Sequence, residues 1–285
     1  MADSSSLRAR LTVPPGPVDL TAHDPRATPG FGGKKSDGKA ALADLGDPLS
    51  ELQERLFAEG RSGGRRRVLL VLQGMDTSGK GGTVRHVAAL LDPQGLRIKA
   101  FAAPTEEELR HDFLWRVRRE LPGPGRIGVF DRSHYEDVLV ARVHQAASEA
   151  EIAARYDAIN AFERELVEGG TTVVKCLLHI SPEEQKERLL ARLDDPSKHW
   201  KFDPGDIDER ACWGDYRAAY EIALERCSTE AAPWLVVPAD RKWYRNWAIA
   251  TVLLETLREL EPTWPEATFD VEQQRRRLTE HDPLG

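Results

Sequence analysis

A buried strand followed by a glycine-rich turn and a lysine constrains the fold of this chain more than any other feature. Residues 68–72 (VLLVL) form a continuous apolar run, which is typical of a strand in a parallel sheet covered on both faces. Residues 74–80 (GMDTSGK) follow and fit G-x-x-x-x-G-K ahead of a predicted helix. In that context, backbone N–H groups and the helix N-terminus create an anion site. We therefore predict a phosphate-binding loop; a turn that merely reverses the chain is the alternative.

Strand and helix patterns alternate beyond this loop. The other strands are expected over 97–102, 127–130, 171–180 and 235–237. Helices are expected over 47–60, 80–91, 105–120, 151–168, 208–228 and 243–260, with a further helix starting at Ser181. Thr105 and Glu108 fit a capping box for the third of these helices. This order predicts an α/β fold, with a five-stranded parallel sheet between two layers of helices.

The two ends of the chain differ in composition from its middle. Residues 1–47 are rich in Pro, Gly, Ser and Asp, so we predict an extended N-terminal arm that is partly ordered at best. Residues 48–265 are assigned to one domain built around the phosphate-binding loop (P-loop). Residues 266–285 are predicted to form a solvated tail, where Arg275, Arg276 and Arg277 leave an anion contact as the alternative.

Composition excludes several classes of protein. The 285 residues carry 40 Lys and Arg against 47 Asp and Glu, a net charge of −7, which argues against nucleic acid as a partner. Residues 61–142 nevertheless carry 15 basic and 10 acidic side chains, and such a local excess favours a bound anion. No apolar run is long enough for a membrane span, and the N-terminus lacks a signal-peptide pattern. Three cysteines without Cys-x-x-Cys spacing agree with a cytoplasmic protein.

The loop itself supplies the first candidate site residues. Lys80 is expected to place a positive charge on the transferring phosphoryl group. Gly81 stands where such loops usually carry the Ser or Thr that binds Mg²⁺. Asp76 is a candidate substitute, because an acid here would repel phosphate without a cation; a turn-stabilising Asp is the alternative. The expected phosphate-binding residues of this segment are Gly74, Thr77, Ser78, Gly79, Gly81, Gly82 and Thr83.

A second acidic centre lies about 50 residues further on. The strand predicted over 127–130 runs directly into Asp131, an arrangement by which P-loop enzymes hold Mg²⁺. Arg132 follows and could bridge two phosphates, since a guanidinium binds phosphate oxygens in pairs. A surface ion pair is the alternative for Arg132.

The segment 188–213 combines cations, turn residues and Trp200 between two predicted helices. We interpret it as a mobile lid that closes over phosphates and excludes water. A solvated loop with a tryptophan anchor is the alternative. Its candidate phosphate-binding residues are Arg188, Arg192, Lys198 and Lys201.

With these residues in place, the chain resembles the polyphosphate kinase 2 family. The most specific segments are GMDTSGKGGT (74–83), DRSHYED (131–137) and DPSKHWK (195–201). Residues 213–221 and 232–243 are similar to later blocks of that family, and DPRATPG (24–30) is similar to its N-terminal segment. The likeness runs from about residue 19 to about residue 263.

The resemblance implies phosphoryl transfer between inorganic polyphosphate and a nucleoside mono- or diphosphate, with Mg²⁺ or alternatively Mn²⁺. It also implies a thymidylate-kinase-like fold with a lid, and a homo-oligomer. Asp76 and Asp131 would hold the metal, while Lys80 and Arg132 would bind the transferring group. Arg192, Lys198 and Lys201 would belong to the lid.

Two departures from the family bear on specificity. Asp203 stands where members often carry Ser. Glu136 and Asp137, expected at the nucleotide, stand where the ADP-specific branch usually has Asn-Arg, so the form is closer to branches that accept AMP, or both AMP and ADP. GMP and GDP stay open as acceptors. The competing hypotheses are an ATP-dependent nucleoside monophosphate kinase and a non-catalytic nucleotide-binding switch.

Overall fold

A five-stranded, all-parallel sheet forms the centre of the computed structural model, which describes residues 6–282 and 284. The strand order is β2-β3-β1-β4-β5. This confirms the predicted α/β class and each of the five strands, to within one or two residues at their ends. The strands are β1 (Arg67–Gln73), β2 (Leu96–Ala100), β3 (Ile127–Asp131), β4 (Thr171–His179) and β5 (Trp234–Pro238).

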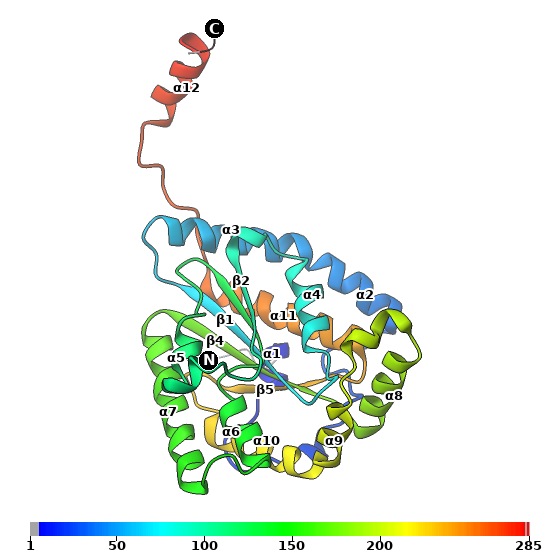
Figure 1. The fold of residues 1–285 in the computed structure, drawn as a ribbon. Helices are drawn as coiled ribbons and strands as arrows, with labels where there is room; N and C mark the ends of the chain where they lie inside the picture. Colours follow the sequence, from blue (N-terminus) through cyan, green and yellow to red (C-terminus); the bar gives the residue numbers. More distant parts are fainter. Residues whose placement is uncertain (1–5, 283, 285) are drawn as a thin grey trace.

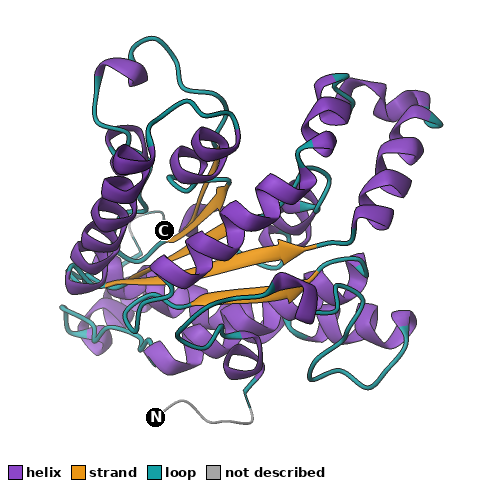
Figure 2. Ribbon diagram, turned by 90° about the horizontal axis from the view of Figure 1, so that it is seen from below, coloured by secondary structure: helices purple, strands orange, loops and turns teal. Residues whose placement is uncertain are grey.

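Helices cover both faces of the sheet (Figures 1 and 2). In β1, Val68, Leu70 and Leu72 pack into one core cluster, while Leu69 and Val71 pack into another on the opposite face, because side chains alternate along a strand. The first face carries α1 (Leu7–Leu11), α3 (Gly46–Arg61), α4 (Lys80–Ala88) and α11 (Lys242–Leu260). The second carries α5 (Trp115–Arg118), α6 (Glu136–Val143), α7 (Glu149–Glu168) and α10 (Trp213–Cys227).

The pairing of β1 with β3 determines where a site can form. Leu72 of β1 lies opposite Asp131 of β3, so the loop after Gln73 starts beside the Asp131 carboxylate. Strand β1 also pairs with β4 on its other side. The chain order therefore reverses at β1, which is the place where open α/β sheets bind ligands.

The N-terminal segment is more ordered than the extended arm that we predicted. Helix α1 docks on α11, where the backbone N–H groups of Leu7 and Arg8 donate to Glu255. Helix α2 (Lys35–Asp44) packs against α11 as well, and Gly38 lies in contact with the Trp243 ring. Residues 1–5, the part of the arm that bears on the signal-peptide prediction, lie outside the described residues.

Three helix predictions were wrong in extent. Residues 105–120 form only a short 3-10 turn, Glu108–Arg110, and α5, because the Asp112 side chain accepts from the Leu114 N–H and starts a new turn. The capping box itself is present, with Thr105 and Glu108 bonded reciprocally. The helix over 208–228 is split at Cys212 into α9 (Gly205–Ala211) and α10, and α4 ends three residues early.

The remaining elements lie around this frame. Helix α8 (Pro182–Leu193), the 3-10 segment Pro196–Lys201 and α9 make up most of residues 188–213. In the predicted tail, α12 (Val271–Glu280) extends away from the body of the molecule (Figure 1). Short 3-10 turns occur at Leu20–Ala22 and Pro93–Gly95. Among the described residues, no helix has the length and apolar content that a bilayer crossing requires.

A fully buried ion pair joins α7 to β4 behind the Asp131 turn. Lys175 Nζ lies 2.6 Å from Glu163 Oε2 and donates to the Cys227 carbonyl at 2.7 Å. Glu163 Oε1 also accepts a hydrogen bond from the Tyr135 hydroxyl at 2.8 Å, and His134 Nε2 lies 3.2 Å from the same oxygen. Burial of a charged pair is tolerated only when both partners are hydrogen-bonded, and this network meets that condition.

Glu163→Ala is expected to lower the free energy of unfolding by about 3–5 kcal/mol, because it leaves the Lys175 ammonium buried without its carboxylate. Glu165→Ala is the matched control on the same helix. Its carboxylate pairs with Arg118 at 2.8 Å but is 61% exposed, so the change should cost less than about 1 kcal/mol. Urea unfolding measures both values, and equal losses would contradict this interpretation.

Candidate active site

The loop between β1 and α4 has the backbone conformation of an anion-binding turn. Gly74 and Gly79 have φ values of 151° and 103°, and Thr77, a non-glycine residue, has a φ of 62°. Left-handed conformations are costly for residues with a Cβ and persist when the surroundings impose them. The loop is thus held in a defined shape, with α4 beginning at Lys80.

Lys80 reaches back across the loop. Its Nζ donates to the Gly74 carbonyl at 2.6 Å and lies 3.4 Å from that of Met75. Burial and the nearby Arg132 cation hold the pKa of Lys80 below its usual value, opposed by Asp76 and Asp131. A buried ammonium surrounded by loop groups is suited to a fixed phosphate contact.

Arg132 lies between Asp76 of the loop and Glu136 at the start of α6. Its Nη2 donates to Asp76 Oδ1 at 3.0 Å, and its Nε lies 3.9 Å from Glu136 Oε2. Burial lowers its pKa, but the carboxylates of Glu136 and Asp76 raise it above the usual value. Burial raises the pKa of Glu136, opposed mainly by Arg132. Arg132 itself has a φ of 65°, so the turn after β3 is strained in the same sense as the loop.

The predicted metal ligands fit a divalent cation shared with phosphate. The Asp131 carboxylate lies beside Gly81, where an added Cβ would stand 3.5 Å from Oδ2. The hydroxyls of Thr77, Ser78 and Thr83 are buried, and within the described chain they have no hydrogen-bond partner. Among the residues that the structure describes, no group of three or more acidic, His or Cys side chains gathers there as a metal cage. Mg²⁺ typically takes one or two carboxylates together with substrate phosphates, which matches this donor set.

Arg188 corrects a prediction. We expected it to bind phosphate, but its five N–H groups are directed to protein acceptors. Nη1 donates to the carbonyls of Thr77 (2.8 Å) and Ser78 (2.9 Å), and Nε donates to Glu184 at 2.7 Å. Nη2 donates to the carbonyls of Ala239 (2.6 Å) and Asp240 (3.1 Å). Arg188 therefore supports the loop from behind.

Arg245 is a second buried arginine behind the loop, and the sequence analysis missed it. Its Nη1 donates to the Ser78 carbonyl at 3.0 Å. Burial and the Arg188 charge lower its pKa to about 9. It lies near the start of α11, outside any sequence motif for phosphate binding, so residue type alone gave no indication.

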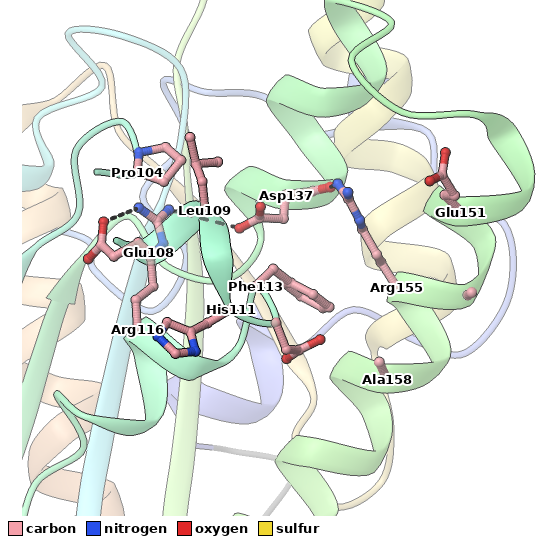
Figure 3. A pocket seen from close by; sticks show the side chains of 12 residues that line it. Pro104, Glu108, Leu109, His111, Phe113, Arg116, Asp137, Glu151, Arg155 and Ala158 are labelled. Atoms are coloured by element: carbon pink, nitrogen blue, oxygen red, sulfur yellow. Dashed lines mark hydrogen bonds and ion pairs between the residues drawn. The ribbon is translucent and has the colours of Figure 1, made fainter. Parts of the chain in front are cut away.

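A cavity of about 750 Å³ opens in front of the loop. Its wall includes Gly74, Asp76, Arg132, Glu136 and Asp137, and from the lid segment Asp203 and Asp206. A second cavity of about 460 Å³ adjoins it (Figure 3) and shares five lining residues: Pro104, Leu109, Arg116, Asp137 and Arg155.

Arg116 and Arg155 are functional candidates that were not predicted. Arg116 is buried, with 7% of its surface exposed. Its guanidinium lies between Glu108 (3.7 Å) and Asp137 (3.9 Å), as Figure 3 shows. Burial raises the pKa of Asp137, opposed mainly by Arg116. The predicted continuous helix over 105–120 gave no indication that Arg116 would be buried.

The predicted lid cations lie outside the two cavity walls. Arg192 donates to the Lys201 carbonyl (2.8 Å) and to Asp206 (3.1 Å). Lys198 pairs with Asp195 at 2.6 Å, and the Lys201 ammonium lies over the Trp200 ring. All of these contacts are within the segment 188–213. Gln185 of α8 connects it to the loop by donating to the Asp76 carbonyl at 3.1 Å.

Comparison with known proteins identifies the family. The polyphosphate kinase 2 family profile matches residues 32–264. The chain belongs to the polyphosphate kinase 2 family. It is 47% identical, over 89% of its own length and 93% of the relative, to an AMP/ADP-polyphosphate phosphotransferase from Meiothermus ruber. It is 44% identical to an ADP-polyphosphate phosphotransferase from Rhodopseudomonas palustris, over 77% of this chain and 79% of that one.

A solved structure agrees with the fold. The crystal structure of polyphosphate kinase 2 from Arthrobacter aurescens TC1 superposes with a TM-score of 0.94 at 55% identity, covering 96% of this chain and 97% of the other. These findings confirm the predicted family, the P-loop kinase fold and the class of enzyme, a phosphotransferase acting between polyphosphate and nucleotides. The ATP-dependent kinase and the non-catalytic switch are not favoured.

Gly79→Ala is expected to reduce kcat/KM for polyphosphate by about 100-fold or more, because φ is 103° and the new Cβ would overlap the Arg245 guanidinium. Gly214→Ala, in α10, is the control for a glycine outside the motif. No atom lies within 4 Å of a Cβ added there, and alanine favours the helix. A change below about fivefold is expected there, from steady-state kinetics; equal losses would show that glycine at 79 has no special role.

Proposed function

We propose that the chain transfers a phosphoryl group from inorganic polyphosphate to AMP and ADP, with Mg²⁺ as cofactor. The observation that carries the proposal is one 750 Å³ cavity whose wall includes Gly74 and Asp76 of the phosphate loop and Arg132 after β3. The Lys80 ammonium is bonded to the Gly74 carbonyl of that wall, and Asp131 directly precedes Arg132 at the end of β3. The acceptor class is supported by the name of the Meiothermus ruber relative and its 47% identity. The Glu136-Asp137 pair is consistent with it. GMP and GDP are further acceptors to test.

The donor phosphate would lie on the loop, between the N-terminus of α4 and the Lys80 ammonium. An oxygen of the acceptor phosphate attacks the terminal phosphorus of the chain, and the bridging P–O bond to the rest of the chain breaks. The products are the elongated nucleotide and a polyphosphate shorter by one unit. Such a transfer needs mainly positioning and charge neutralisation, so no covalent enzyme intermediate is proposed.

Arg132 is proposed to contact both the donor and the acceptor phosphates. Its guanidinium is held between Asp76 and Glu136, and its planar fork can bind oxygens of two phosphates. Asp76 and Asp131 would hold the Mg²⁺ ion. A bound Mg²⁺ neutralises the charge on neighbouring phosphate oxygens. These carboxylates thereby make an acidic loop compatible with an anionic substrate.

The nucleoside part of the acceptor is proposed to occupy the second cavity (Figure 3). Its wall combines an aromatic side chain, Phe113, with the cations Arg116 and Arg155. A mixed apolar and polar lining is typical of sites for ligands of nucleoside size. Asp137 Oδ2, buried without a hydrogen-bond partner among the described residues, is available to a donor group of the ligand.

The proposal also covers the lid segment, the oligomeric state and the cellular location of the enzyme. Residues 188–213, with Arg192, Lys198 and Lys201, are proposed to close over the polyphosphate chain. A homo-oligomer and a cytoplasmic location are also proposed, from the family resemblance and the composition.

The donor and acceptor are tested with purified full-length enzyme. AMP, ADP or GDP is offered with Mg²⁺ and either polyphosphate or ATP, and the products are separated by chromatography. We expect ADP and ATP to form from polyphosphate, and chelation by EDTA to abolish the reaction until Mg²⁺ is restored in excess. Phosphoryl transfer from ATP but not from polyphosphate would overturn the proposal in favour of a nucleotide kinase.

Lys80→Ala and Asp131→Asn are each expected to reduce turnover at least about 100-fold, because each removes a charge placed on the reacting phosphates. Lys39→Ala on α2 and Asp157→Asn on α7 are matched controls, since both side chains are exposed and far along the chain from the loop. Circular dichroism checks that the fold is retained. Near-normal turnover of either site variant would remove that residue from the mechanism.

A further inference from the structure

The backbone carbonyl of Ser78 accepts hydrogen bonds from two buried arginines. Arg188 Nη1 lies 2.9 Å and Arg245 Nη1 3.0 Å from this oxygen. The described residues contain no cis peptide bond, so the N–H of Gly79 points away from the Ser78 carbonyl. Fixing the carbonyl from behind therefore directs the Gly79 N–H to the opposite side of the loop, where phosphate is proposed to lie.

Two glycines of the motif make room for Arg245. A Cβ on Gly79 would overlap its guanidinium, and a Cβ on Gly82 would stand 3.2 Å from Nη2. Gly79 also needs glycine because of its positive φ, whereas Gly82 lies inside α4. The glycine pattern of this loop is thus matched to an arginine that comes from the far end of the chain.

The two arginines differ in how their charge is compensated. Arg188 forms an ion pair with Glu184 at 2.7 Å. Arg245 donates to neutral acceptors: Nη1 to the Ser78 carbonyl, and Nη2 (2.9 Å) and Nε (3.2 Å) to Asn246 Oδ1. Among the described residues, no carboxylate forms an ion pair with it. With a pKa of about 9 it is still protonated at neutral pH. Glu184 raises the pKa of Arg245 from a distance, but its carboxylate is paired with Arg188. A buried cation with no ion pair of its own among the described residues stabilises an anion bound nearby.

We propose that Arg245 is a positioning residue for the donor phosphate. It fixes the orientation of the Gly79 amide and places a buried positive charge behind the loop. Arg245 does not touch the substrate. The inference rests on the proposed function only in that the loop holds the donor phosphate.

The test compares Arg245→Gln and Arg245→Lys in the full-length enzyme. For Arg245→Gln we expect the Kd of tripolyphosphate and the KM of polyphosphate to rise by roughly 10- to 100-fold, as for loss of a charged hydrogen-bonding group. The KM of the nucleotide acceptor should change less than about threefold, because Arg245 lies behind the donor site. Arg245→Lys retains the charge but not the guanidinium fork, so it should recover part of the loss in Kd.

Arg66→Gln is the matched control. Arg66 also bonds a backbone carbonyl, that of Leu260, together with Glu59, but it precedes β1 and so lies at the opposite end of that strand from the loop. It is expected to lower the melting temperature while leaving the Kd of tripolyphosphate unchanged. A residue that only stabilises the fold would behave in this way.

Asn246→Ala keeps Arg245 but removes the side-chain amide that orients it. This second variant allows the inference to be tested even if Arg245→Gln does not fold. A smaller rise in Kd, in the same direction, is expected. Wild-type affinity for tripolyphosphate in folded Arg245→Gln, or in both Arg245→Lys and Asn246→Ala if Arg245→Gln does not fold, would overturn the inference. Failure of the wild-type enzyme to use polyphosphate would instead overturn the proposed function.

Discussion

The parallel pairing of β1 with β3 is the constraint on which the rest of the site depends. With Leu72 opposite Asp131, the phosphate loop and the Asp131–Arg132 turn leave the sheet side by side. The helices then bring the other charges to this edge. Arg188 comes from α8 and Arg245 from α11, while Glu136 starts α6. A one-residue slip between β1 and β3 would turn the Asp131 side chain to the other face of the sheet and separate the carboxylate from the loop.

The charges around the loop are arranged in two layers. The front layer, facing the cavity, contains Asp76, Glu136 and Arg132. The rear layer contains two buried arginines that bond the loop carbonyls. Because electrostatic interactions are strong in a poorly hydrated interior, the rear cations act on the loop through fixed peptide groups. The front carboxylates can accommodate a cation with the substrate, so acidic side chains and an anionic substrate are compatible in one site.

The elements that the sequence predicted well are those determined by local pattern. Apolar runs identified the five strands, and G-x-x-x-x-G-K identified the loop and its lysine. Helix α2 was missed because its sequence is polar, and the structure stabilises it by packing Gly38 against Trp243. Arg188 was read as a phosphate ligand because residue type cannot distinguish a phosphate from backbone carbonyls that lie far away in the sequence. Arg245 was missed for the same reason: its partner, Ser78, is 167 residues distant.

The segment 101–118 shows why irregular structure at this edge matters for chemistry. A continuous helix over 105–120 would satisfy the apolar pattern and the capping box. Asp112 instead starts a new turn, and the chain then buries Leu114 and Val117 beneath the second face of the sheet. The same turn places Arg116 at 7% exposure, with its guanidinium on the Ala102 carbonyl and beside Asp137. A cation buried in a cavity wall loses little further hydration when an anionic ligand binds, and its rotamer is already fixed, so binding costs less entropy. The interrupted helix is therefore the local feature that places Arg116 in the wall of the second cavity, where the nucleoside is proposed to lie.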